Sequence, residues 1–439
     1  MTLGARSISS YEARSAESCS DTARFRSRRV TVGRLIVGSP GLCLPVERSA
    51  SLVAALRKKY FGRVVRSSHP RARVRSPGVT AEEIAKRIVS GGVAPSCAAG
   101  CASFSTSWRR EVGGDEAMFF DLASVTKPMT AVAIARAGIA KETPLGALLK
   151  EARGTASEHV SIELLLAHRA GLAAHQAFFE PVRGAVAGSV DVEGVMRRAA
   201  DARRDDARGE IPLDGFAPLY SDVGYILAGH ALAQAVGARD AGEAIGGLVL
   251  EPLGITDEAG TVRELKARGV KGPFAATEEV AWRGGRVLGA VHDENAWVLT
   301  GHGGSGHAGI FSTVGALLKF GSAVLDAWAG REGKLGRADL SWLVGPRPGG
   351  TLRAGFDGKS PAGSSAGEQF GRASFGHLGF AGTSLWIDPD ANVVVALLTN
   401  RVHVSRHHGA IRSARPWAHD ALWTRAREIS DRHPQGAAG

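Results

Sequence analysis

Ser124 and Lys127 form the residue pair whose types and spacing suggest chemistry most directly. They lie three residues apart in the run FDLASVTKP, and no other lysine in the sequence has a serine at this offset. The apolar, alanine-rich residues 129–140 that follow predict a buried helix that opens at Ser124. Three residues is nearly one helical turn, so the hydroxyl and the amine would share one face. An amine within reach supplies the base that a serine nucleophile needs.

The start of a helix gives such a hydroxyl a second advantage. Pro128 suits a first turn, where the backbone N–H that proline lacks would have no partner. The free N–H groups of that turn can stabilise a developing oxyanion. Serine and lysine at this spacing also occur on solvated helix surfaces, so the pair alone leaves that alternative open.

Elements near both ends of the chain must position this pair. Residues 80–89 predict a helix with Thr80 as its N-cap. Residues 95–121 predict a hairpin whose turn lies at Gly113-Gly114. Between these residues and the C-terminal part, the pattern is mostly helical over 124–300. The helices expected there, besides the one at Ser124, cover residues 161–168, 190–204 and 221–236.

The pattern changes near the C-terminus. Residues 383–387 and 393–399 read as strands, and the intervening Asp-Pro-Asp-Ala-Asn is a strong turn signal. A final helix is expected over 413–429. Strands at both ends around a helical middle predict one α+β domain, with its sheet built from about 95–121 and 371–403.

Composition locates the charge of this chain outside that domain. The 439 residues carry a net charge of +11, and a hydrophobic content of 44% is ordinary for a globular protein with a sizeable core. Residues 1–76 hold 16 Lys and Arg against 4 Asp and Glu, whereas the remainder holds 38 against 39. The basicity therefore says nothing about partners of the domain at 78–439, for which we expect no nucleic acid.

The basic segment 1–77 is rich in arginine and serine and shows little periodicity. We predict a disordered tail, or sequence upstream of the true start of the folded protein; an arm for nucleic acid or an acidic surface remains an alternative. No apolar core of a secretory signal follows its basic residues, and no uninterrupted apolar stretch approaches a membrane span. This favours a cytoplasmic location without excluding export.

Metal-ligand chemistry is poorly supported. Cys97 and Cys101 have no adjacent Cys/His pair and are expected to be small buried side chains. His168, just before Gly171, is expected to be a structural residue that hydrogen-bonds the last turn of a helix. We expect no metal and no cofactor. The residues that would have to supply a metal site are His292, Asp293, Glu294, His302 and His307.

Further motifs follow the serine–lysine pair in a characteristic order. The motif FDLASVTKP at 120–128 is followed by LLLAHRAGL at 164–172, YSDVGYILAG at 220–229, HDENA at 292–296, GHAGIFST at 306–313 and FGHLGFAGTSLWIDP at 375–389. In this order and spacing the chain resembles the serine β-lactamase-like, penicillin-recognising family, which contains class C β-lactamases, D-Ala-D-Ala carboxypeptidases and related esterases. The resemblance runs from about residue 80 to 428 and implies a β-lactamase/transpeptidase-like fold.

The resemblance implies roles for individual residues. Ser124 would be the acylated nucleophile, and Lys127 would share or remove its proton. Tyr220 would relay a proton to the leaving group and activate the deacylating water. The backbone N–H groups of Ser124 and Phe380 would form the oxyanion hole. The residues implied to contact substrate are Asp222, His377, Gly379 and Phe380.

Two departures from the family pattern bear on substrate. Asp222 stands where the family has Asn, and an ionised carboxylate can only accept hydrogen bonds. It should also hold Lys127 protonated. His377-Leu378 replaces a permanent ammonium and a hydroxyl, and His377 should be mostly neutral at pH 7.

These departures favour a small-molecule ester, or an amide without a free carboxylate, over penicillins. We therefore predict a serine hydrolase that works through an acyl-enzyme, with weak or no β-lactamase activity. A genuine β-lactamase or D-Ala-D-Ala carboxypeptidase is one alternative. A non-catalytic binding protein of the same family is another. The sequence does not indicate the oligomeric state.

Overall fold

The computed structural model describes residues 78–184 and 188–431, so the predicted tail 1–77 lies outside the described residues. A six-stranded antiparallel sheet has the order β2-β1-β11-β10-β9-β8. Strands from both ends of the domain are thus neighbours, which confirms the predicted α+β architecture. The strand bounds are β1 Cys97–Phe104, β2 Trp108–Gly114, β8 Asp357–Gly358, β9 Phe375–Leu378, β10 Ser384–Asp388 and β11 Val393–Thr399.

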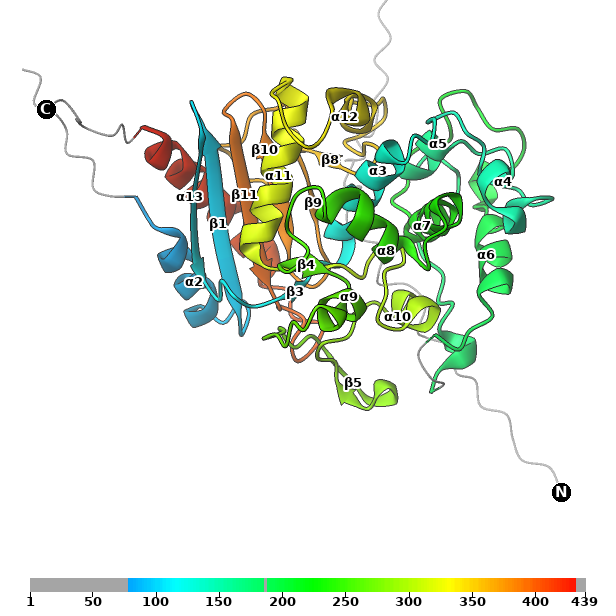
Figure 1. Cartoon of the computed structure of the whole chain (residues 1–439), viewed down its shortest axis with the longest axis horizontal. Coiled ribbons are helices and arrows are strands. Elements are labelled where there is room, and N and C mark those ends of the chain that lie inside the picture. Colours follow the sequence, from blue (N-terminus) through cyan, green and yellow to red (C-terminus); the bar gives the residue numbers. More distant parts are fainter. Residues whose placement is uncertain (1–77, 185–187, 432–439) are drawn as a thin grey trace, which may run out of the picture. The chain divides into compact units, whose positions relative to one another are not determined.

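The central pairing joins β1 to β11, from Cys97 opposite Thr399 to Ser103 opposite Val393. Helices cover both faces of this sheet. Helices α2 (Ala81–Ser90) and α13 (Ile411–Asp431) pack on one face and α11 (Val314–Ala329) on the other (Figure 1). Side chains of β1 and β11 therefore alternate between two apolar cores, which explains why both strands are buried almost throughout.

The predicted hairpin forms, but its predicted turn is wrong. The chain reverses at 105–107, between β1 and β2, and the two glycines lie at the end of β2. A Cβ on Gly113 would be 2.2 Å from the backbone nitrogen of Glu82, and one on Gly114 would be 2.2 Å from the Cys97 carbonyl oxygen. These glycines are needed for the close approach of α2 to the sheet, and turn chemistry alone could not reveal that.

The N-terminal helix and the two neighbouring cysteines behave as predicted. Thr80 caps α2, and its hydroxyl and the Glu83 carboxylate form a capping box with the backbone. Cys97 and Cys101 are buried free thiols. Among the described residues no helix is long and apolar enough to cross a membrane.

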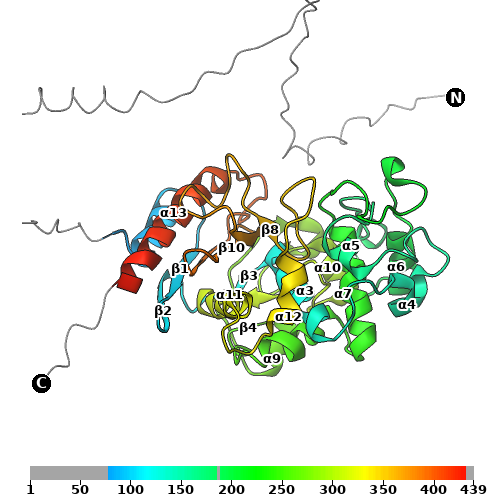
Figure 2. The same cartoon turned by 90° about the horizontal axis from the view of Figure 1, so that it is seen from above.

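A mostly helical region lies beside the sheet, at the opposite end of the described part from α13 (Figure 2). Several of its helices are shorter than the sequence predicts, because turns with left-handed residues such as His168 and Gly138 end them early. The helix bounds are α3 Thr126–Arg136, α4 Leu145–Leu148, α5 Ile162–Leu166, α6 Val192–Ala200, α7 Asp222–Val236, α8 Ala241–Ile245, α9 Val262–Ala267, α10 Glu294–Thr300 and α12 Arg337–Val344.

A small second sheet ties the serine motif to the rest of the domain. Its order is β3 (Phe120–Asp121), β7 (Phe311–Ser312) and β4 (Ala259–Gly260). The end of the predicted 95–121 sheet segment therefore belongs to a separate sheet. Because β3 leads directly into Ser124, this pairing fixes the serine relative to the chain around residue 310.

Candidate active site

Ser124 lies in a short 3₁₀ turn, Ala123–Val125, that leads into α3. The residue before it, Ala123, has φ +48°, a conformation that costs energy for a residue with a Cβ. The Ala123 N–H is held by the Asp121 carboxylate at 2.8 Å. The sequence predicts a helix that opens at Ser124 and continues to residue 140. In the structure the helix begins at Thr126 and ends at Arg136.

Lys127 is the centre of the polar network. Its side chain is fully buried, and its Nζ donates hydrogen bonds to Ser124 Oγ at 2.8 Å and to Asp222 Oδ1 at 2.7 Å. A third donation, at 3.3 Å, reaches the carbonyl oxygen of His307. An ammonium has three hydrogens to donate, so Lys127 can bond these partners at the same time.

Tyr220 completes the group that the sequence predicts. Lys127 Nζ lies 4.9 Å from the centre of the Tyr220 ring. The ring stacks on His168 at 4.6 Å and lies 6.0 Å from the ring of His377. Asp222 follows two residues later as the first residue of α7. Residues from α3, from the start of α7 and from β9 thus meet around Ser124.

His168 has a structural role, and the bond predicted to the last turn of its helix is present: its N–H donates to the Leu165 carbonyl at 3.1 Å. In addition, its Nδ1 accepts a hydrogen bond from the Ser221 N–H at 2.9 Å, a partner that the sequence did not reveal. Burial and the nearby Lys127 lower the pKa of His168 to about 3, so it stays a neutral acceptor. His168 therefore fixes the Tyr220-Ser221 segment through two contacts: its ring stacks on the Tyr220 ring, and its Nδ1 accepts from the Ser221 N–H.

The charges of the lysine and the aspartate are coupled. Burial disfavours the charged form of Lys127, but the Asp222 carboxylate and the Tyr220 phenol hold the lysine pKa above its ordinary value. Burial would likewise raise the pKa of Asp222, but Lys127, His175 and His307 lower it well below its usual range. The two side chains form an ion pair at neutral pH, which confirms the predicted effect of Asp222 on Lys127.

The other two titratable members of the group are neutral at pH 7. Burial raises the pKa of Tyr220, while Lys127 opposes that rise. Burial and Lys127 lower the pKa of His377 to about 3, which confirms the predicted neutral imidazole. Among these four side chains, positive charge next to Ser124 thus comes from Lys127 alone, and Asp222 neutralises it.

Gly379 and Phe380 form the turn after β9, next to the serine segment. A Cβ on Gly379 would be 2.4 Å from the Leu122 carbonyl oxygen, and the Thr383 hydroxyl donates to that oxygen at 2.8 Å. Ala123 packs with Ala381 in a small apolar cluster. The two predicted oxyanion-hole segments therefore lie against each other. The side chain of Phe380 is half exposed and stacks on His292 at 5.8 Å.

Asp121, Asp293 and His307 received no catalytic role from the sequence, but they form hydrogen bonds around the residues near Ser124. The buried Asp121 accepts hydrogen bonds from the N–H groups of Ala123 and His292, the latter at 2.6 Å. Asp293 Oδ1 lies 2.8 Å from Nε2 of the buried His307, whose carbonyl holds Lys127. The motifs HDENA and GHAGIFST were visible in the sequence, but only the fold pairs them.

In the part of the chain that the structure describes, no group of three or more His, Cys, Asp or Glu side chains is placed to hold a metal ion. The residues concerned form pairs instead: His307 with Asp293, and His292 with Glu278 at 3.1 Å.

Asp293→Asn should lower the melting temperature in a pH-dependent way. Burial disfavours a charged His307, but Asp293 raises the histidine pKa above its ordinary value. The pairing should therefore stabilise the fold fully below the unfolded pKa of about 6.5, and this stabilisation should disappear as the pH rises through the folded pKa. Since Asp293 is partly exposed, we expect a loss of about 2 kcal/mol near pH 6 that shrinks at alkaline pH.

Thermal unfolding from pH 5.5 to 9.5 measures this difference. Asp205→Asn, which breaks an exposed ion pair with Arg208, is the matched control and should have little effect at any pH. A loss of stability for Asp293→Asn that grows with pH would contradict the assignment of the charged pair.

Curated proteins resemble part of this chain in sequence. A putative D-alanyl-D-alanine carboxypeptidase of Escherichia coli (strain K12) is 26% identical over 201 residues, which cover 42% of this chain and 45% of that protein. An N-acetylmuramyl-L-alanine amidase of Bacillus subtilis (strain 168) is 29% identical over 223 residues, covering 44% and 47%. The chain thus spans about half the length of the curated relatives it matches.

Solved structures extend the likeness to the whole domain. A class C beta lactamase from Rhodobacter sphaeroides matches with a TM-score of 0.55 at 14% identity, covering 78% of this chain and 97% of that one. A family VIII carboxylesterase matches with a TM-score of 0.53 at 14% identity, covering 78% and 95%. At such identities the likeness establishes the fold, which is β-lactamase/transpeptidase-like as predicted.

The family model named Beta-lactamase matches residues 108–415, which is most of the chain and includes every residue of the group around Ser124. The chain belongs to the beta-lactamase family, whose members are serine hydrolases.

Proposed function

We propose that this protein hydrolyses ester or amide bonds through an acyl-enzyme formed on Ser124. The observation that carries the proposal is the position of Lys127 Nζ, 2.8 Å from Ser124 Oγ and 2.7 Å from Asp222 Oδ1, beside Tyr220. A nucleophile, an amine in hydrogen-bond reach and a group that orients the amine are the components of an activated serine. A protein that only binds its ligand has no need of all three.

In the proposed acylation step, Ser124 Oγ attacks the substrate carbonyl carbon and its proton passes to Lys127. Since the ion pair with Asp222 keeps the lysine mostly charged, the reactive form is the minor neutral amine. Tyr220 then relays a proton to the departing alcohol or amine. Water, activated through the same phenol, releases the acid and restores Ser124.

The tetrahedral intermediates carry a negative oxygen that needs donors. The proposed donors are the backbone N–H groups of Ser124 and Phe380. Support comes from the packing of Ala123 on Ala381, which places the two segments against each other. Such preorganised donors commonly contribute a large part of the rate enhancement in acyl transfer.

The substrate class follows from the charges around the serine. His377 is neutral and the adjacent Leu378 has no hydroxyl, so β9 offers no permanent cation to a substrate carboxylate. Asp222 offers acceptors but no amide donor. We therefore propose uncharged esters or amides as substrates, with weak or no turnover of β-lactams. Since the relatives include an amidase and a putative carboxypeptidase, amides stay within the proposal.

Hydrolysis of p-nitrophenyl acetate should exceed that of nitrocefin at matched concentration, by about tenfold or more in kcat/KM. The reason is that loss of a charged partner for the β-lactam carboxylate costs at least one charge-assisted hydrogen bond, worth about 1.5–3 kcal/mol. Ser124→Ala is the control and should remove both activities. Faster hydrolysis of nitrocefin would overturn the preference for esters, and ligand-induced thermal stabilisation without any product would favour a binding protein.

A further inference from the structure

Arg415 is a buried arginine that contacts the turn after β9 from helix α13. It is 8% exposed, and its Nη2 donates to the carbonyl oxygens of Gly379 at 2.8 Å and Thr383 at 2.9 Å. Its Nε has no hydrogen-bond partner, and no carboxylate of the described residues forms an ion pair with it. A buried cation that contacts only carbonyl oxygens is costly to stability, so its position calls for an explanation.

The Gly379 carbonyl and the Phe380 N–H belong to one peptide unit. A hydrogen bond from a cation to the oxygen of an amide polarises that amide and makes its N–H a stronger donor. It also fixes the plane of the peptide and hence the direction of the N–H. We propose that Arg415 is a positioning residue that orients and polarises the Phe380 N–H as an oxyanion donor. This inference rests on the proposed function.

Neighbouring contacts hold the same turn from its other side. Arg401 Nε donates to the Phe380 carbonyl oxygen at 2.9 Å, and the Arg401 guanidinium lies 4.5 Å from the centre of the Phe380 ring. The Thr383 carbonyl accepts from Arg415 and also from the Gly379 N–H at 2.7 Å. The peptides before and after Phe380 are thus each held by one arginine, which leaves the intervening N–H little freedom to rotate.

The charge of Arg415 persists under the conditions of catalysis. Burial and the nearby Arg401 lower the pKa of Arg415 to about 10, which still leaves the guanidinium charged at neutral pH. A neutral side chain of similar length could fill the same space without the free-energy cost of burying a charge. The presence of a charged side chain at this position is therefore better explained by its effect on the Gly379-Phe380 peptide than by packing.

Three variants of this residue test the inference. Arg415→Met removes the donor and the charge, Arg415→Gln keeps a donor without charge, and Arg415→Lys keeps a charge with simpler geometry. For p-nitrophenyl acetate we expect Arg415→Met to lower kcat by about 10–100-fold with little change in KM, less than the 10²–10³-fold loss caused by deleting a donor outright. The lysine variant should recover more activity than the glutamine variant.

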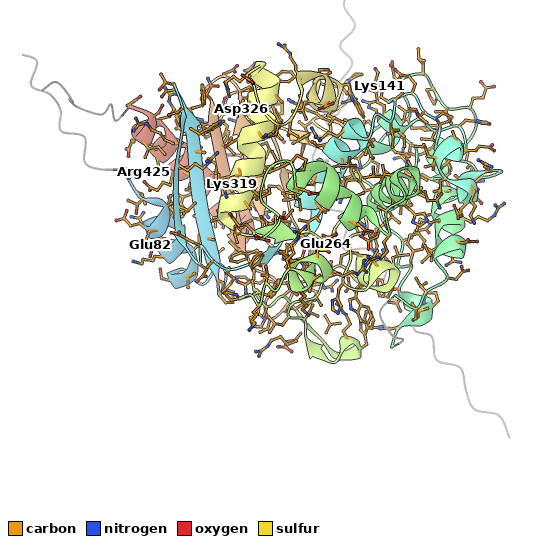
Figure 3. The ribbon with its side chains drawn as sticks, viewed as in Figure 1. Glu82, Lys141, Glu264, Lys319, Asp326 and Arg425 are labelled. Atoms are coloured by element: carbon orange, nitrogen blue, oxygen red, sulfur yellow. The ribbon has the colours of Figure 1, made fainter. Side chains whose placement is uncertain are left out.

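Arg425→Met is the matched control on the same helix. Arg425, which is labelled in Figure 3, is also a buried arginine of α13, but it binds the Glu111 carboxylate of β2. The Arg425→Met substitution should lower the melting temperature while leaving kcat unchanged. If Arg415→Met does not fold, the comparison of Arg415→Lys with Arg415→Gln decides, since both retain a donor.

The rate at which a fluorophosphonate labels Ser124 separates this inference from the proposed function. That reaction also develops negative charge on an oxygen, so Arg415→Met should slow it in proportion to kcat. A folded Arg415→Met that labels and turns over at the wild-type rate would overturn the role of Arg415 alone. Failure of the wild-type protein to label at Ser124 would overturn the proposed function itself.

Discussion

Lys127→Met should lower kcat/KM for p-nitrophenyl acetate by about 10³–10⁴-fold, the cost of removing a general base that acts as one unit with its nucleophile. Methionine has a similar length but cannot accept the Ser124 proton. The variant also leaves Asp222 without the ammonium at 2.7 Å, so some loss of stability should accompany the loss of activity. Steady-state kinetics together with thermal unfolding would separate the two effects.

The control for this variant is Lys319→Met on α11. Lys319, which is labelled on α11 in Figure 3, pairs with Glu258 at 2.6 Å, and both side chains are partly exposed. Its replacement should leave kcat/KM unchanged. Retention of more than about a tenth of wild-type activity by folded Lys127→Met would assign the base to another residue, with Tyr220 as the remaining candidate.

Asp222→Asn should shift the alkaline rise of kcat/KM to lower pH. Asp222 raises the pKa of Lys127, so the neutral amine that the mechanism needs becomes abundant only at high pH, and the wild-type rate should rise with pH through the alkaline range. Removing the carboxylate lowers the lysine pKa, so the same fraction of neutral amine is reached earlier. A pH–rate profile from pH 6 to 11 measures the shift.

The same substitution supplies an amide donor that the family pattern normally has at this position. One new hydrogen bond to a substrate carbonyl is worth about 1 kcal/mol, so the ratio of nitrocefin to ester hydrolysis should rise by about fivefold. Asp326→Asn is the matched control, because Asp326 accepts from Arg331 and Trp108 outside the site. An unchanged pH profile for Asp222→Asn would show that the ion pair does not set the protonation state of the base.

Much of this site could be predicted because its members lie in short motifs. The serine and lysine are three residues apart, and Tyr220 and Asp222 are two apart, so each pair is positioned by one helix start. The sheet was likewise predictable in outline, since the strands at both ends carry strong apolar patterns. To predict that these segments meet at one site, the order of all the motifs was needed, because no single residue pair indicates it.

The remaining parts depend on contacts that local pattern cannot encode. The role of Gly113 depends on how close α2 comes to β2. The Ser221 N–H that His168 accepts from is 53 residues away, and the pairing of His307 with Asp293 depends on the loop after α10, which returns the chain to the N-cap of that helix. Arg415 is separated from Gly379 by 36 residues and by a change from strand to helix. In each case a polar or small residue contacts a group that lies elsewhere in the sequence, and such a contact leaves no periodic pattern in the sequence.

Intact-mass spectrometry of the purified protein after brief exposure to a fluorophosphonate, followed by peptide mapping, tests the central claim most directly. The account predicts a single stoichiometric adduct on Ser124 of the wild-type protein and no adduct on a folded Ser124→Ala variant. Absence of labelling in the wild-type protein, or equal labelling of the two proteins, would contradict the assignment of Ser124 as the nucleophile.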